Sequence, residues 1–68
     1  MQDFVKRLIV ERDELITKWE KLRDFFHSEK TESLNNENLA LLSAQFNIMG
    51  AYICILGRRI EINSEEGQ

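Results

Sequence analysis

The chain begins with a long segment in which apolar residues recur at alternating steps of three and four. This spacing puts the apolar side chains on one face of an α-helix. One polar residue, Arg12, interrupts that face, and its apolar members are Val5, Leu8, Leu15, Trp19, Leu22 and Phe26. The pattern predicts a helix over about residues 3–27.

A second segment has two apolar series, on largely opposite sides of the expected helix. The first series is Leu39, Leu42, Phe46, Met49, Ile53, Leu56 and Ile60. The second series, interrupted only by Arg58, is Leu41, Ala44, Ile48, Ala51, Ile55, Arg58 and Ile62. No charged residue occurs between Asn38 and Gly57. The pattern predicts a helix over about residues 36–62 that is buried on both sides.

A short polar linker of residues 28–33 separates the two segments, so the helices should lie antiparallel. Asn35 can cap the first turn of the second helix. The sequence thus predicts a single helical-hairpin domain over residues 1–62. The polar residues 63–68 are expected to form a flexible tail.

The first helix can cover only one apolar side of the second, which predicts self-association. With 68 residues, one cysteine and one histidine, the chain has neither an intrachain disulfide nor a zinc cluster to stabilise it. Glycines on one line of the second helix indicate a close approach of backbones. We expect an all-α antiparallel two-helix hairpin that assembles into a homo-oligomeric helical bundle. The expected interface residues are Leu41, Ile48, Gly50, Ile55, Gly57 and Ile62.

Charge and hydropathy argue against several partners and cellular locations. A net charge of −3 argues against DNA as a partner. The uncharged stretch has the length of a membrane span, but Asn38, Gln45 and Asn47 within it are costly in lipid. The N-terminus lacks the apolar run of a signal peptide, and a free cysteine fits a reducing compartment. We therefore expect a cytoplasmic protein.

In an antiparallel hairpin closed by this linker, residues whose numbers sum to about 63 face each other. This rule pairs Glu11 with Tyr52 and Lys18 with Gln45 along one flank. Such polar pairs have two interpretations: they fix the register of the hairpin, or they line a groove for a small anionic ligand. The ligand hypothesis uses cationic groups for phosphate and aromatic groups for a base. Its candidate residues are Arg12, Lys18, Trp19, Gln45, Tyr52, Arg58 and Arg59.

Some of these residues have simpler structural interpretations. Trp19 lies within the apolar face of the first helix, where a core role is expected. Arg58 and Arg59 lie near the end of the second helix and interact favourably with the negative end of its dipole.

Catalytic chemistry has no support in the sequence. The acidic residues of the first helix face neither a histidine nor a second acidic pair, so neither a metal site nor a general acid–base site is predicted. Phosphate-binding loops, nucleophile elbows and dinucleotide fingerprints are absent from the sequence. We expect a protein that is not an enzyme and that needs no cofactor.

The sequence resembles a family of short helical-hairpin proteins encoded by tailed bacteriophages and prophages, some related to a product of a crAss-like phage. The resemblance covers about Phe4 to Ile62. In the first helix it rests on Glu11, Glu14, Leu15, Lys18, Leu22, Phe25 and Phe26. In the second helix it rests on Leu41, Leu42, Gln45, Met49, Tyr52, Leu56, Arg59 and Ile60. The Asn35–Asn38 run, Gly50 and Gly57 depart from the family pattern.

The resemblance implies a phage accessory protein and supplies no catalytic residue. Small early phage proteins often counter host defences. Unrelated small helical phage proteins form oligomers that hold cyclic nucleotide immune signals between protomers. By that analogy the partners are further copies of the chain and either a nucleotide signal or a host defence protein. The alternative is a structural or adaptor protein of a phage particle or complex.

Overall fold

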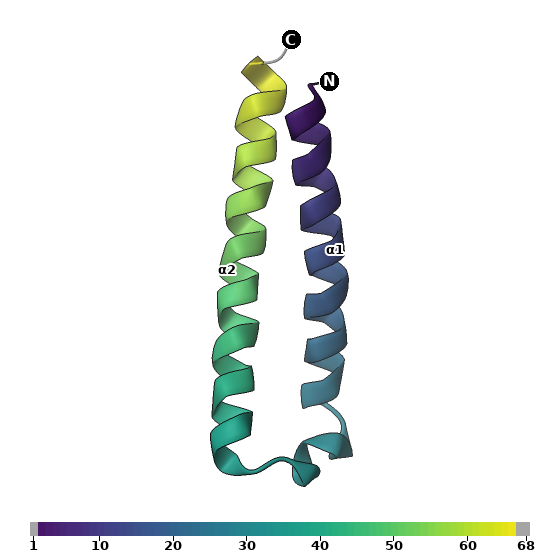
Figure 1. The fold of residues 1–68 in the computed structure, drawn as a ribbon, viewed down its shortest axis with the longest axis vertical. Helices are drawn as coiled ribbons and strands as arrows, with labels where there is room; N and C mark the ends of the chain where they lie inside the picture. Colours follow the sequence, from purple (N-terminus) through teal and green to yellow (C-terminus); the bar gives the residue numbers. More distant parts are fainter. Residues whose placement is uncertain (1, 67–68) are drawn as a thin grey trace.

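The computed structural model describes residues 2–66, with side chains through Ser64. Helix α1 spans Asp3–Phe26, the 3-10 helix η1 spans Glu29–Ser33, and helix α2 spans Asn36–Glu66. The two long helices lie side by side and antiparallel, with both ends of the chain at one end of the hairpin and η1 at the other (Figure 1). The prediction of an all-helical two-helix hairpin is thus confirmed.

Local hydrogen bonds set the turn between the helices. The Ser28 hydroxyl donates to the Phe25 carbonyl at 2.7 Å and accepts from the Lys30 amide at 3.3 Å. At the start of α2 the Asn35 side chain accepts the Asn38 amide at 2.8 Å, as the capping prediction requires. Within this polar linker the structure adds the short 3-10 helix η1.

The C-terminal end of α2 lies beyond the predicted boundary at Ile62. The helix continues to Glu66, four residues past that boundary, and residues 67–68 of the predicted tail lie outside the described part. Asn63 donates its side-chain amide to the Arg59 carbonyl at 2.7 Å. No proline or glycine occurs after Gly57 until Gly67, so a polar composition alone did not end the helix.

The buried core is small and lies toward the end of the hairpin that holds the two termini. Among the described residues, it consists of Val5, Leu8, Leu56 and Ile60. The hairpin measures 50 × 15 × 14 Å, with a radius of gyration of 15.4 Å. A compact domain of this length would have a radius of gyration of about 11 Å. The chain is therefore a rod of two helices, and much of its apolar surface stays uncovered.

Candidate functional site

The register of the hairpin is marked by a contact between Tyr52 and Glu11. The Tyr52 hydroxyl donates a hydrogen bond to the Glu11 carboxylate, as the pairing rule predicted. This bond, with desolvation and the charge of Glu11, raises the pKa of Tyr52 above its usual value, while Arg59 acts in the opposite direction. The hydroxyl therefore stays protonated at neutral pH and can hold the two helices in register.

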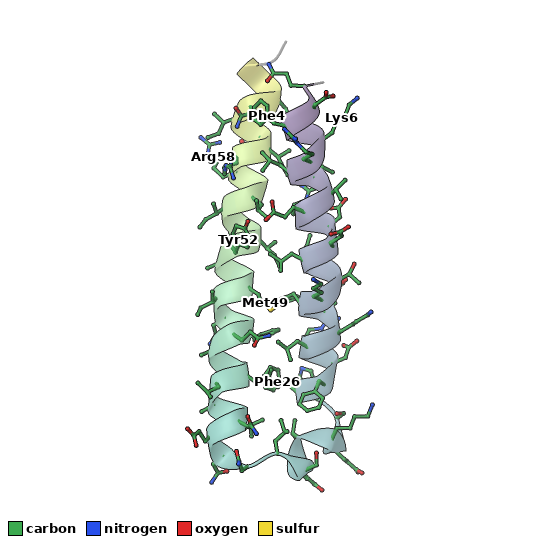
Figure 2. The ribbon with its side chains drawn as sticks, viewed as in Figure 1. Phe4, Lys6, Phe26, Met49, Tyr52 and Arg58 are labelled. Atoms are coloured by element: carbon green, nitrogen blue, oxygen red, sulfur yellow. The ribbon has the colours of Figure 1, made fainter. Side chains whose placement is uncertain are left out.

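A groove of about 450 Å³ opens between α1 and α2 on the same flank, nearer the turn. Its volume falls in the range of small-molecule sites. Lys18 and Gln45, paired in the sequence prediction, both line it. The full lining is Lys18, Lys21, Leu22, Phe25, Leu42, Gln45 and Met49. Met49 lies between the two helices in Figure 2. The groove thus combines two cationic side chains and one amide with an apolar floor.

The hollow continues toward the turn. A second depression of about 260 Å³ shares Leu42 and Gln45 with the groove and adds Leu34, Asn38 and Leu41. The two depressions together form a continuous track along one flank, with Gln45 at its middle. The amides of Gln45 and Asn38 supply donors and acceptors along a mostly apolar surface.

Trp19 lies away from this groove. Its ring stacks on Phe46, with centroids 4.8 Å apart and planes 13° apart, and Phe46 also meets the edge of Phe26 at 5.5 Å. The Arg23 guanidinium lies 5.7 Å from the Trp19 ring centroid. Both Phe46 and Arg23 therefore compete with any ligand base for this ring. These contacts favour the core role expected for Trp19 over stacking on a ligand base.

The predicted cationic residues are dispersed along the hairpin. Arg12 pairs with its neighbour Asp13 at 3.2 Å, and Arg58 pairs with Glu61 at 3.0 Å. Figure 2 shows Arg58 on the side of α2 that faces away from α1. Arg59 is exposed, and its positive charge opposes the rise in the pKa of Tyr52. Of the predicted ligand residues, the structure brings only Lys18 and Gln45 into one groove.

The predicted interface residues divide into two lines on α2. Leu41, Ile48 and Ile55 are exposed by 63%, 69% and 55%, and Ile62 is partly buried. Gly50 lies on another line of the helix. It leaves room for the Trp19 side chain of the same hairpin, since a Cβ there would stand 3.3 Å from Nε1 of Trp19. A Cβ on Gly57 would meet nothing within 4 Å. Packing against Trp19 within the hairpin is thus a second explanation for Gly50, beside the predicted contact between copies.

A third depression, of about 270 Å³, lies on the opposite flank. It is lined by Ile16, Trp19, Glu20, Gly50, Ile53 and Cys54 and is almost wholly apolar. Among the side chains of residues 2–64, no group of three or more histidine, cysteine or acidic residues is arranged to hold a metal ion. This flank therefore offers mainly apolar contacts to a partner or ligand.

Sequence reasoning missed Lys21 and Met49 as groove residues, whereas it placed Phe25 on the flank of Lys18. Lys21 and Phe25 follow Lys18 by three and seven positions, which places them along the same side of α1. That spacing was a usable signal for Lys21. The apolar floor of the groove could not be recognised in the same way, because Leu22, Leu42 and Met49 have the same spacing as ordinary core residues.

Comparison with known proteins gives one family. A family model described as Sequestin matches residues 2–62, which is nearly the whole hairpin. Neither the comparison with curated proteins nor that with solved structures gives a match.

Proposed function

The chain belongs to the Sequestin family, and we propose from this that it sequesters a nucleotide immune signal in the groove between α1 and α2. The family name suggests a protein that binds rather than one that catalyses. The observation that carries the proposal is the juxtaposition of Lys18, Lys21 and Gln45 over an apolar floor.

The chemistry of the groove suits a phosphorylated nucleoside. Lys18 and Lys21 are point charges for phosphate oxygens. Leu22, Phe25 and Met49 offer apolar contact for a base, and Gln45 can both donate to and accept from its edge. The same residues include no activated nucleophile or base, which fits stoichiometric binding.

The biological role in this proposal is defence against host immunity. A phage protein that removes a nucleotide signal from the bacterial cytoplasm would stop the signal from reaching its effector. The effect scales with the amount of protein, since each site holds one ligand. Arg59 and Tyr52, further along the same flank, extend the track that a larger ligand would follow.

Further copies of the chain complete the site in this proposal. The groove is an open furrow on a rod 15 Å wide, and an open site loses much of the water-excluding benefit of a pocket. A neighbouring hairpin would cover the furrow and bury the ligand between protomers. The exposed apolar residues of α2 supply a surface for that contact.

A structural or adaptor role in a phage complex is the second candidate. It is favoured by the exposed Leu41, Ile48 and Ile55, which would suit a protein partner equally well. Presence of the chain in stoichiometric amounts in purified particles would support this role. Abundance early in infection together with absence from particles would oppose it.

Thermal shift with a panel of cyclic dinucleotides, cyclic trinucleotides and ADP-ribose derivatives tests the proposal. We expect at least one compound to raise the melting temperature of the wild-type protein. The double variant Lys18→Glu/Lys21→Glu should bind that compound about 100-fold more weakly, because two charge-assisted contacts are lost.

The matched control is Lys6→Glu/Lys30→Glu, which changes the net charge equally at exposed positions outside the groove. Its affinity should stay within about twofold of the wild-type value. If no compound shifts the wild-type melting temperature, the nucleotide proposal fails and protein binding becomes the better account. Equal weakening in both double variants would assign the binding to net charge rather than to the groove.

A further inference from the structure

The outer face of α2 carries an apolar stripe that α1 leaves uncovered. We define the outer stripe as Leu41, Ala44, Ile48, Ala51, Ile55 and Arg58. All six residues are exposed, and only 6% of the most apolar stretch of the helix is buried. The spacing of three and four is that of a coiled-coil seam, which normally faces another helix.

We propose that the outer stripe binds the same stripe of a second copy of this chain, with the two α2 helices antiparallel. Large and small side chains alternate along the stripe: Leu41, Ala44, Ile48, Ala51, Ile55. In an antiparallel pair the two kinds of position face each other, so Ile48 packs on Ala51 of the second copy. Ala44 then packs on Ile55. Each layer holds one large and one small residue, which allows the two helices to approach evenly.

A parallel pair would not fit the same side chains. It would set Ile48 against Ile48 and Ala51 against Ala51, so that crowded layers would alternate with underfilled ones. Underfilled layers leave cavities, and crowded layers force side chains from their preferred rotamers. The alternation of sizes therefore selects the antiparallel orientation.

Charge at the ends of α2 selects the same orientation. Glu37 lies in the first turn of the helix, and Arg58 lies toward its other end. In the antiparallel register the stem of Arg58 covers Leu41 of the second copy, and its guanidinium comes within about one turn of Glu37 there. The helix dipoles are also opposed, which is favourable. Arg58, which pairs with Glu61 in the single chain, would gain a second carboxylate.

The dimer brings together the polar flanks of both hairpins. Gln45 and Tyr52 lie along one edge of the outer stripe, so Gln45 of one copy comes beside Tyr52 of the other. The second copy would thus contribute an aromatic edge to the groove that holds Lys18. This consequence rests on the proposed function, whereas the dimer itself rests on α2 alone.

A membrane is the other environment that would cover this face. By length and composition, the stretch Asn36–Ser64 of α2 could cross one. However, Gln45 and Asn47 border the stripe near its middle, where polar amides are costly in lipid. Lipid chains also present no fixed large and small positions that the alternation of isoleucine with alanine would match. The second copy is therefore the occupant that the side chains specify.

Disulfide trapping in a Cys54→Ser background tests orientation and register together. The symmetry axis of the proposed dimer lies between Ile48 and Ala51. It places the two copies of Ala51 roughly 5 Å apart along the helices and the two copies of Ala44 roughly 16 Å apart. A disulfide needs Cα atoms within about 7 Å. We expect Ala51→Cys to form a covalent dimer under mild oxidation and Ala44→Cys to remain uncrosslinked.

A mixture of two variants gives an independent readout at another layer. Ala44→Cys and Ile55→Cys should each fail to cross-link alone but should cross-link to each other when mixed. Cross-linking of Ala44→Cys alone would indicate a parallel pair and overturn the proposal. Absence of any cross-link in folded protein would overturn it too, and co-sedimentation with lipid vesicles would then identify a membrane as the occupant.

Discussion

Replacing Ile48 with glutamate should convert the protein from a dimer to a monomer of 8.0 kDa. Ile48 is 69% exposed in the single chain and lies near the symmetry axis of the proposed dimer. A carboxylate there would have to be desolvated without a partner, at a cost on the order of several kcal/mol per ion. The two glutamates would also lie in adjacent layers, roughly 5 Å apart along the helices, and would repel each other. Light scattering at micromolar concentration measures the mass directly.

Val10→Glu is the matched control for this substitution. Val10 is 55% exposed on the outer face of α1, so the same exchange of an apolar residue for a charge occurs away from the outer stripe. This variant should keep twice the chain mass and the helical circular dichroism of the wild type. A folded Ile48→Glu protein of unchanged mass would exclude the outer stripe as the interface. A wild-type mass near 8.0 kDa would contradict the dimer itself.

Leu56→Ala should unfold most of the protein at room temperature. Leu56 is fully buried and packs with Val5, Leu8 and Ile60 in the only core that the described residues form. Removing a buried leucine side chain costs about 2–5 kcal/mol. A core of this size stabilises a small domain by roughly 3–5 kcal/mol, so the loss takes up most of the margin.

Urea unfolding followed by circular dichroism tests this expectation. Val10→Ala serves as the control because it truncates an exposed apolar side chain, and it should change the free energy of unfolding by less than about 0.5 kcal/mol. An unfolding midpoint for Leu56→Ala close to the wild-type value would mean that the hairpin core does not determine stability. The contacts between copies would then have to supply it.

Periodicity predicted the elements of this fold because the two helices have unusually regular apolar faces. It also predicted the register, since the linker length fixes which residues meet, and Tyr52 does contact Glu11. The sequence places the end of α2 too early because residues 63–66 are polar. They include no helix breaker, and the helix continues to Glu66. Amino-acid type alone does not separate a polar last turn from a frayed tail.

The groove was only partly predictable. Lys18 and Gln45 followed from the pairing rule, whereas Trp19 was assigned two roles that only packing could decide. The stripe of glycines suggested a contact between chains, yet Gly50 makes room for Trp19 of its own hairpin. A small residue indicates that another group packs close to it, but the sequence does not say whether that group belongs to the same chain.

Recovery of an intact nucleotide from the protein tests sequestration most directly. The wild-type protein is incubated with a compound that raises its melting temperature, free compound is removed, and the protein is denatured by heat. The account predicts that one chemically unchanged nucleotide is released per groove, as mass spectrometry would detect. Release of a cleaved or modified product, or failure of the protein to retain any nucleotide, would contradict it.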